Sequence, residues 1–262
     1  MSEYTDHHAP EGLLTRGTVV VVPGRGESRA VYGRFGRRLA ADAYRVRVVD
    51  GPRIDAADLH GSLARFGDRL AAAVAGTAAA GEEVTGPVVL VGADSGAAAV
   101  AALLGLGGSA AAVRPQAVVL AGLPGAGGAV AGTGGRAGTW DDELAVRTSC
   151  PTHRGVLGDD PQARPGALGV PVPGALLDAA HHADLAVPAL LLVGDADPLA
   201  DRHALARTAK SLSRARLAVV RDAHHDVLND LQHRSVAAEV VTFLEALRTG
   251  LVPAVAVASS AW

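Results

Sequence analysis

The chain has 262 residues, of which 49% are hydrophobic and 19% charged, and its formal net charge is -3. This length and composition allow a substantial core, and we expect one α/β domain. The small negative charge, without a dense Lys/Arg block, argues against nucleic-acid binding and favours a small-molecule substrate as the partner. The single cysteine, Cys150, excludes an intrachain disulfide and a zinc site built from several thiolates.

The two ends of the chain carry little targeting information. Residues 1–8 are polar and acidic and lack the basic start and apolar stretch of a secretory signal, which predicts a cytoplasmic protein. No apolar run reaches the roughly 18 to 20 residues that span a bilayer, so we expect no membrane partner. The short apolar tail 251–258 is expected to be buried against the domain or against a second copy, in a homodimer.

Short runs rich in β-branched residues alternate with stretches of helical period, which is typical of a parallel sheet with helices on both faces. Most of the predicted strands are nearly continuous apolar runs, as expected when both faces are covered. The strands are predicted at 18–22, 44–49, 88–91, 117–120, 189–193 and 215–220. The helices are predicted at 30–41, 57–75, 95–104, 202–212 and 234–248.

The segment 122–185, between the fourth and fifth predicted strands, breaks this alternation. Its first part, 122–138, is so rich in glycine that we expect a mobile loop there rather than a helix or strand. An insertion of this length usually forms a lid or cap over a substrate site. We therefore predict a core domain formed by 1–121 and 186–262, with 122–185 as the lid.

Four short motifs follow predicted strands, and each contains a residue type that catalysis uses. They are Val-Val-Pro-Gly-Arg-Gly at 21–26, Gly-Ala-Asp-Ser-Gly at 92–96, Val-Gly-Asp-Ala-Asp-Pro at 193–198 and Asp-Ala-His-His-Asp-Val-Leu-Asn at 222–229. In this order they resemble the oxyanion loop, nucleophile elbow, acid and histidine of the α/β-hydrolase superfamily. The order nucleophile, acid, histidine is the one that this fold uses.

The resemblance implies an α/β-hydrolase fold with a mostly parallel sheet of about six strands, and it implies no cofactor. It places Asp94 at the nucleophile position, Asp197 as the acid and His225, rather than His224, as the catalytic histidine. Backbone N–H groups of Arg25 and Ser95 would form the oxyanion hole. The adjacent histidine pairs elsewhere lack the spacing of metal ligands, so no metal site is expected.

An aspartate at the elbow changes the chemistry that the resemblance implies. A carboxylate is already ionised, so it can attack carbon directly and form an alkyl-enzyme ester, which water then hydrolyses with His225 as base. Epoxide hydrolases and haloalkane dehalogenases work in this way. The sequence departs from the first group because Tyr4, Tyr32 and Tyr44 all lie outside the lid, and from the second because Ser95 replaces a halide-binding tryptophan.

Lid residues could take over the missing role of proton donor or anion clamp. We expect Trp140, His153 and Arg154 to contact the substrate. This expectation depends on their place in the predicted lid and not on a motif.

Two alternatives remain open. In the first, Ser95 is the nucleophile of a serine esterase or lipase, with the elbow shifted to 93–97; Gly92 and Gly96 flank Asp94 symmetrically and favour Asp94. In the second, the fold is kept for a lyase, a cyclase or a ligand-binding protein. A pure binding role is disfavoured by the intact Asp197 and His225.

A dinucleotide site is disfavoured because Arg29 stands where the G-x-G-x-x-G pattern needs its last glycine.

Overall fold

The computed structural model describes residues 4–78, 82–106, 113–125, 138–255 and 258–259. Within these ranges the chain forms a seven-stranded sheet with the order β1-β3-β2-β4-β5-β6-β7. The strands are β1 (Tyr4–His7), β2 (Thr18–Val22), β3 (Arg45–Val49), β4 (Val88–Ala93), β5 (Ala117–Ala121), β6 (Ala189–Gly194) and β7 (Ala215–Val220). Strands β2 to β7 run parallel, and β1 pairs antiparallel with β3. The six predicted strands are therefore confirmed.

The antiparallel edge strand β1 adds a seventh strand to the six that were predicted. Its sequence, Tyr-Thr-Asp-His, has no apolar run that would indicate a strand. It is held by side chains of its neighbour: the Arg47 guanidinium forms an ion pair with Asp6 (2.6 Å) and lies 3.5 Å from the centre of the Tyr4 ring. Polar side chains are typical of edge strands, because they discourage pairing with other chains.

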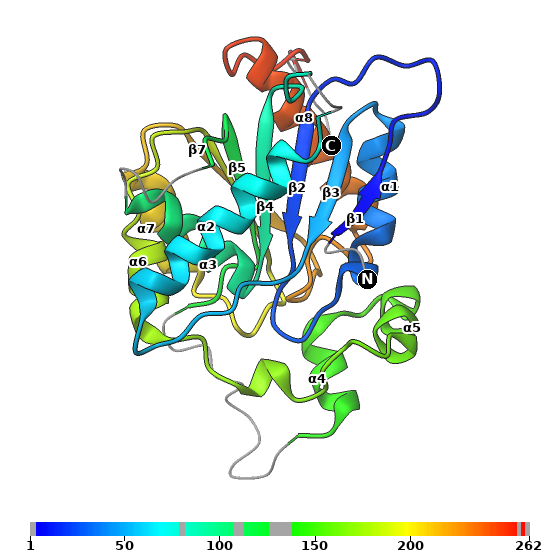
Figure 1. Ribbon diagram of the computed structural model, residues 1–262. Coiled ribbons are helices and arrows are strands. Elements are labelled where there is room, and N and C mark those ends of the chain that lie inside the picture. Colours follow the sequence, from blue (N-terminus) through cyan, green and yellow to red (C-terminus); the bar gives the residue numbers. More distant parts are fainter. Residues whose placement is uncertain (1–3, 79–81, 107–112, 126–137, 256–257, 260–262) are drawn as a thin grey trace.

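Helices cover both faces of the sheet (Figure 1). On one face lie α1 (Gly33–Ala41) and α8 (His233–Arg248), and on the other α2 (Leu59–Ala75), α3 (Ser95–Gly105), α6 (Gly174–His181) and α7 (Arg202–Ser211). The alternation of side chains along each strand fills two cores. In β2, Val20 and Val22 face the α3 side while Val19 and Val21 face the α1 side. The predicted helix at 30–41 begins as a 3₁₀ turn, Arg29–Tyr32, before α1.

The segment predicted as a lid contains two short helices beyond the carboxyl ends of the strands, α4 (Trp140–Arg147) and α5 (Pro151–Asp159) (Figure 1). A 3₁₀ turn follows at Ala167–Gly169. The next helix, α6, belongs to the core layer, because its buried side chains pack in the same cluster as α3. Most of the predicted glycine-rich loop lies outside the described residues. The lid and its boundaries stay a prediction.

Candidate active site

The turn between β4 and α3 has the geometry of a nucleophile elbow, with Asp94 at its centre. The backbone of Asp94 has φ 47° and ψ -119°, a conformation that non-glycine residues rarely adopt. The flanking glycines explain how the turn fits. A Cβ on Gly92 would lie 2.6 Å from the Cα of Ala97, and one on Gly96 would lie 2.6 Å from the carbonyl oxygen of Val22. The strained residue is therefore Asp94, with Ser95 as the first residue of the helix.

The structure brings Asp94, His225 and Asp197 together, although they follow three different strands. His225 Nε2 lies 3.1 Å from Asp94 Oδ1, and His225 Nδ1 lies 3.0 Å from Asp197 Oδ2. All three side chains are buried. His224 turns away, and its backbone N–H donates to Asp230 Oδ2 at 2.6 Å. Of the two adjacent histidines, His225 is the one that contacts the carboxylates of Asp94 and Asp197.

Arg25 contacts Asp94 with its backbone and with its side chain. The backbone N–H of Arg25 donates to Asp94 Oδ2 at 2.8 Å, which is the placement expected of an oxyanion-loop donor. The guanidinium also donates to this carboxylate, from Nε to Oδ2 (2.9 Å) and from Nη2 to Oδ1 (2.8 Å). Its Nη1 donates to the carbonyl oxygens of Leu168 (3.2 Å) and Val170 (2.7 Å). The resemblance pointed only to the backbone group of Arg25, and nothing local in the sequence indicates the side-chain contact.

These neighbours set the charge states of the site. Burial raises the pKa of Asp94, but the hydrogen bonds and charges of His225 and Arg25 outweigh it and hold that pKa well below its usual range. Burial lowers the pKa of His225, but the carboxylates of Asp197 and Asp94 raise it to about 10. At neutral pH the resting site therefore holds an imidazolium between two carboxylates.

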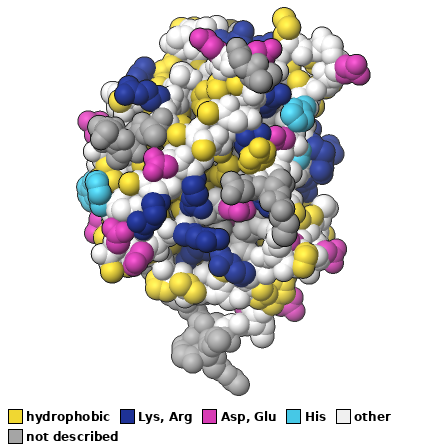
Figure 2. Space-filling model, in the orientation of Figure 1, with side chains coloured by type: hydrophobic (Ala, Val, Ile, Leu, Met, Phe, Trp, Pro, Cys, Tyr) yellow, Lys and Arg dark blue, Asp and Glu magenta, His cyan; other side chains and the backbone are white. Residues whose placement is uncertain are grey.

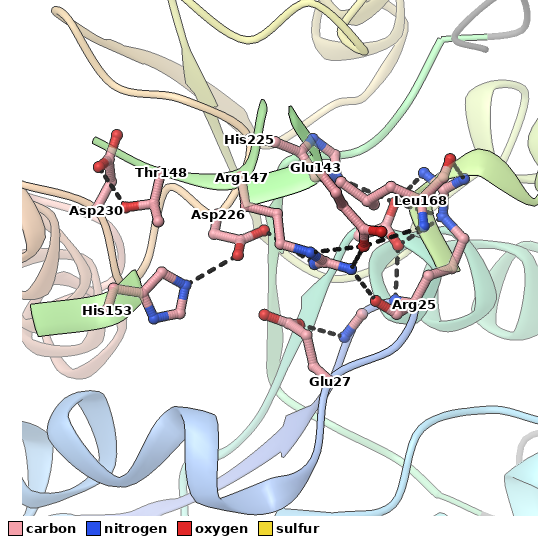
Figure 3. A network of polar contacts seen from close by, with 12 residues as sticks. Arg25, Glu27, Glu143, Arg147, Thr148, His153, Leu168, His225, Asp226 and Asp230 are labelled. Carbon is pink, nitrogen blue, oxygen red and sulfur yellow. Dashed lines mark hydrogen bonds and ion pairs between the residues drawn. The ribbon is translucent and has the colours of Figure 1, made fainter. Parts of the chain in front are cut away.

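A second buried polar cluster lies beside the first, and we call it the Arg147 network (Figure 3). Arg147 Nη2 donates to Glu143 Oε1 and to the carbonyl oxygen of Arg25, both at 2.7 Å. Its Nη1 lies 3.5 Å from Asp226 Oδ1, and Asp226 Oδ2 is 2.9 Å from His153 Nε2. Glu143 also accepts a hydrogen bond from the Leu168 N–H at 3.3 Å. The network thus holds both the Arg25 backbone and the segment that accepts from the Arg25 guanidinium.

Glu27 lies at the edge of this network. Its Oε2 accepts from the Gly24 N–H at 2.8 Å and from the Tyr32 hydroxyl at 2.5 Å. Burial, assisted by the nearby Asp226 carboxylate, raises the pKa of Glu27 to about 7. In the described ranges, Glu27, His153 and Asp226 bring three potential metal-ligand atoms within 4.8 Å of one another. The Arg147 guanidinium already supplies a positive charge beside Asp226, which makes this cluster a poor cation site.

Two cavities lie near Asp94, His225 and Asp197, which we call the triad. A small one of about 10 Å³ is lined by Asp94, His225 and Asn229 among others, and its size is close to the minimum that one water molecule needs. A larger open pocket of about 630 Å³ is lined by Arg25 and Ser95, among others, but not by Asp94. Asp94 and His225 thus line a water-sized space, while the large pocket is lined by Arg25 and Ser95, the neighbours of Asp94.

The predicted substrate-contacting residues lie away from this pocket. Trp140 begins α4 and is partly packed against the core on the α1 side. His153 is buried in the Arg147 network, and an Arg154 Nη2 atom lies 3.4 Å from the carbonyl oxygen of Asp141. None of the three lines either cavity next to Asp94 in the described part of the chain. That they contact the substrate stays a prediction.

Comparison with known proteins identifies the fold. The sequence matches no protein-family model and no curated protein. Among solved structures, the monoacylglycerol lipase of Paleococcus ferrophilus is 18% identical, with a TM-score of 0.64 over 93% of this chain and 98% of that chain. A soluble variant of monoglyceride lipase from Saccharomyces cerevisiae is 14% identical, with a TM-score of 0.68 over 93% and 91% of the two chains.

The enol-lactonase from Burkholderia xenovorans is also similar, with 19% identity and a TM-score of 0.59 over 92% of this chain and 95% of that chain. At these identities the likeness extends to the fold and not to the reaction. The chain has the α/β-hydrolase fold, as its four motifs predicted. In the described part of the chain, no helix is long and apolar enough to cross a membrane.

Proposed function

We propose that this protein is a hydrolase that acts on a small organic electrophile through a covalent alkyl-enzyme ester on Asp94. The observation that carries the proposal is the placement of the two carboxylate oxygens. Oδ2 accepts from the Arg25 backbone N–H, while Oδ1 faces His225 Nε2. The Arg25 guanidinium donates to both oxygens. Oδ2 is held in addition by the backbone donor, and Oδ1 is the candidate to attack carbon once the guanidinium releases it.

In the first step, Asp94 Oδ1 forms a bond to an electrophilic carbon, and the bond from that carbon to its leaving group breaks. The leaving group departs with the electron pair. The Arg25 guanidinium, a fixed cation beside Asp94, is placed to stabilise this developing negative charge. It would supply the function that lid tyrosines or a halide-binding tryptophan supply in the enzymes that the elbow resembles.

In the second step, water attacks Cγ of the ester and His225 takes its proton. Alkylation removes the negative charge of Asp94, so one of the two carboxylates that raise the pKa of His225 is lost. The imidazolium can then release its proton to the departing group or to solvent and act as a base. The water-sized cavity beside Asp94 and His225 supports this step.

The negative charge that forms on Oδ2 when water adds is met by the Arg25 N–H, already at 2.8 Å. The Ser95 N–H is the second donor in this proposal, because the first N–H groups of a helix have no acceptor within the helix. Collapse of the intermediate releases the alcohol. The Asp94 carboxylate is regenerated with one oxygen from water.

The decisive experiment uses His225→Gln. If the ester forms on Asp94 and its hydrolysis needs the imidazole, this variant will accumulate the adduct after addition of an alkyl halide or epoxide. Mass spectrometry of the peptide that contains residues 94 and 95 will show the added mass on Asp94. Wild-type enzyme in heavy-oxygen water will acquire label in the Asp94 carboxylate over repeated turnovers. Asp94→Asn is the matched control and will show neither adduct nor turnover.

A second candidate is a serine esterase or lipase that uses Ser95. Two observations favour it: Ser95 lines the large pocket, and two of the similar structures are lipases that act on monoacylglycerol or monoglyceride by name. Against it, His225 Nε2 contacts Asp94. Activity that survives Asp94→Asn and is lost in Ser95→Ala would replace the first candidate with this one. If neither substitution changes turnover, both hydrolase mechanisms fail.

A further inference from the structure

Arginines outnumber carboxylates in the lining of the large pocket, where one of them, Arg25, is paired with the Asp94 carboxylate behind it. Three arginines line the pocket, Arg25, Arg53 and Arg164, against two carboxylates, Glu27 and Asp50. Figure 2 shows a group of Lys and Arg side chains near the middle of the face, with others spread over its upper part. A site with this charge favours an anion over a neutral or cationic ligand.

The two carboxylates do not neutralise these cations. Asp50 is engaged by Arg29, with Nε to Oδ1 at 3.2 Å. Glu27 is turned inward, where it accepts hydrogen bonds from Tyr32 and from the Gly24 N–H. The acidic groups of the lining are therefore committed to other partners.

Two of the arginines remain available. Arg53 and Arg164 come from separate segments, after β3 and before the turn at Ala167–Gly169, and both are exposed. In the part of the chain that the structure describes, neither guanidinium has a recorded ion pair or hydrogen bond. Two exposed cations that line one pocket make it favourable for an anion to bind there.

Arg25 connects the pocket to the reacting group. Its guanidinium is shared between the Asp94 carboxylate and the carbonyl oxygens of Leu168 and Val170. A planar guanidinium can hold an oxyanion with two parallel hydrogen bonds. An anion in the pocket would compete for Arg25, and this competition would free Asp94 Oδ1 to attack.

We propose that the pocket binds an oxyanion group, a carboxylate or a phosphate, that belongs to the substrate. Arg53 and Arg164 attract this group at the pocket mouth, and Arg25 binds it next to Asp94. The inference rests on the proposed function for the identity of the pocket as a substrate site. It adds the substrate class: a small electrophile that carries a negative charge near the reacting carbon.

The first test measures binding alone, on the full chain. Sodium phosphate and sodium acetate are titrated by calorimetry at constant ionic strength, with sodium chloride as the reference salt. Either oxyanion should bind and chloride should not, and the tighter of the two indicates the source of the group. Arg53→Gln and Arg164→Gln should each weaken binding roughly threefold, as for exposed charge pairs, and the double variant about tenfold.

The matched control is Arg207→Gln, an exposed arginine on α7 outside the pocket. It should leave the affinity unchanged. Unfolding midpoints without added anion show that all variants are folded. If phosphate and acetate bind no better than chloride, or if the double variant binds them like the wild type, the anion site does not exist.

The second test separates this inference from the proposed function. Turnover of glycidate is compared with that of its neutral isostere glycidamide, and 2-chloropropionate with 2-chloropropionamide. We expect kcat/KM to favour each carboxylate, and the double variant to reduce that preference about tenfold. If anions bind and no electrophile is turned over, the proposed function fails while the anion site stands. Equal turnover of acid and amide without anion binding leaves the function and overturns the inference.

Discussion

The two buried polar clusters of this molecule have similar composition and different geometry. The triad cluster and the Arg147 network each contain two carboxylates, a histidine and an arginine, and each is shielded from solvent. Only the triad cluster includes a residue with strained backbone, Asp94 at φ 47°, and only its arginine lines the large pocket. Buried charge by itself therefore does not identify an active site. The strained backbone of Asp94 and the pocket lined by Arg25 are what distinguish the first cluster from the second.

The Arg147 network lies next to the triad and holds the backbone groups that position Arg25. Arg147 binds the carbonyl oxygen of Arg25, and Glu143 binds the N–H of Leu168, whose carbonyl oxygen accepts from Arg25 (Figure 3). Such contacts fix the position of a group that touches Asp94. We expect substitutions in the network to lower mainly the stability of the protein. Substitutions in the triad should lower mainly its turnover.

The largest expected effect on the triad side, apart from loss of the nucleophile, comes from Asp197→Asn. The amide cannot stabilise the imidazolium or hold the same tautomer, so kcat should fall about 10⁴-fold, or about 5 kcal/mol of transition-state stabilisation. Steady-state turnover of a reactive halide or epoxide measures this. A variant with wild-type kcat would remove Asp197 from the triad.

On the network side, Arg147→Met should cost about 3 to 5 kcal/mol of unfolding free energy, because it leaves buried carboxylates without their cation. Urea unfolding followed by circular dichroism gives this value. The matched control is Arg147→Lys, which keeps the charge but loses the bidentate geometry. Its loss of unfolding free energy should be smaller than that of Arg147→Met. An Arg147→Met variant with the stability of the wild type would show that the network does not stabilise the fold.

A smaller effect is expected from Glu27→Gln, and it depends on pH. The folded protein keeps a proton on Glu27 up to about pH 7, whereas the ordinary pKa is 4.5. The folded state thus binds more protons between these values, and the stability contributed by Glu27 is complete below pH 4.5 and lost as pH rises through 7. The variant should lack this decline. Unfolding free energies at pH 4.5, 6 and 7.5, taken as differences from wild type, provide the measurement.

The smallest effect is expected at an exposed ion pair outside both clusters. Arg65 Nη2 lies 3.0 Å from Asp58 Oδ2 near the start of α2, and both side chains are more than half exposed. Arg65→Gln should change the unfolding free energy by less than about 1 kcal/mol and leave turnover unchanged. A loss of unfolding free energy as large as that expected for Arg147→Met would mean that burial does not decide how much an ion pair contributes to stability.

The sequence predicted the six parallel strands because apolar, β-branched runs produce buried strands locally. It did not predict β1, whose polar side chains are held by Arg47 across 41 residues of chain. The range predicted as a lid, 122–185, also contains α6, whose Leu176 and Leu177 pack in the same core cluster as α3. This packing depends on the neighbouring helix and leaves no local pattern that separates a core helix from a lid helix.

At the candidate site, the sequence by itself determined the motif order and the glycines that allow the elbow, because both are properties of short segments. Only the tertiary structure decided which side chains meet there. Contact between His225 and Asp94 joins residues 131 positions apart, and the Arg25 guanidinium reaches Asp94 across 69 positions. Such contacts arise when parallel strands bring their carboxyl ends to one edge of the sheet, and side-chain direction there is set by packing rather than by sequence neighbours.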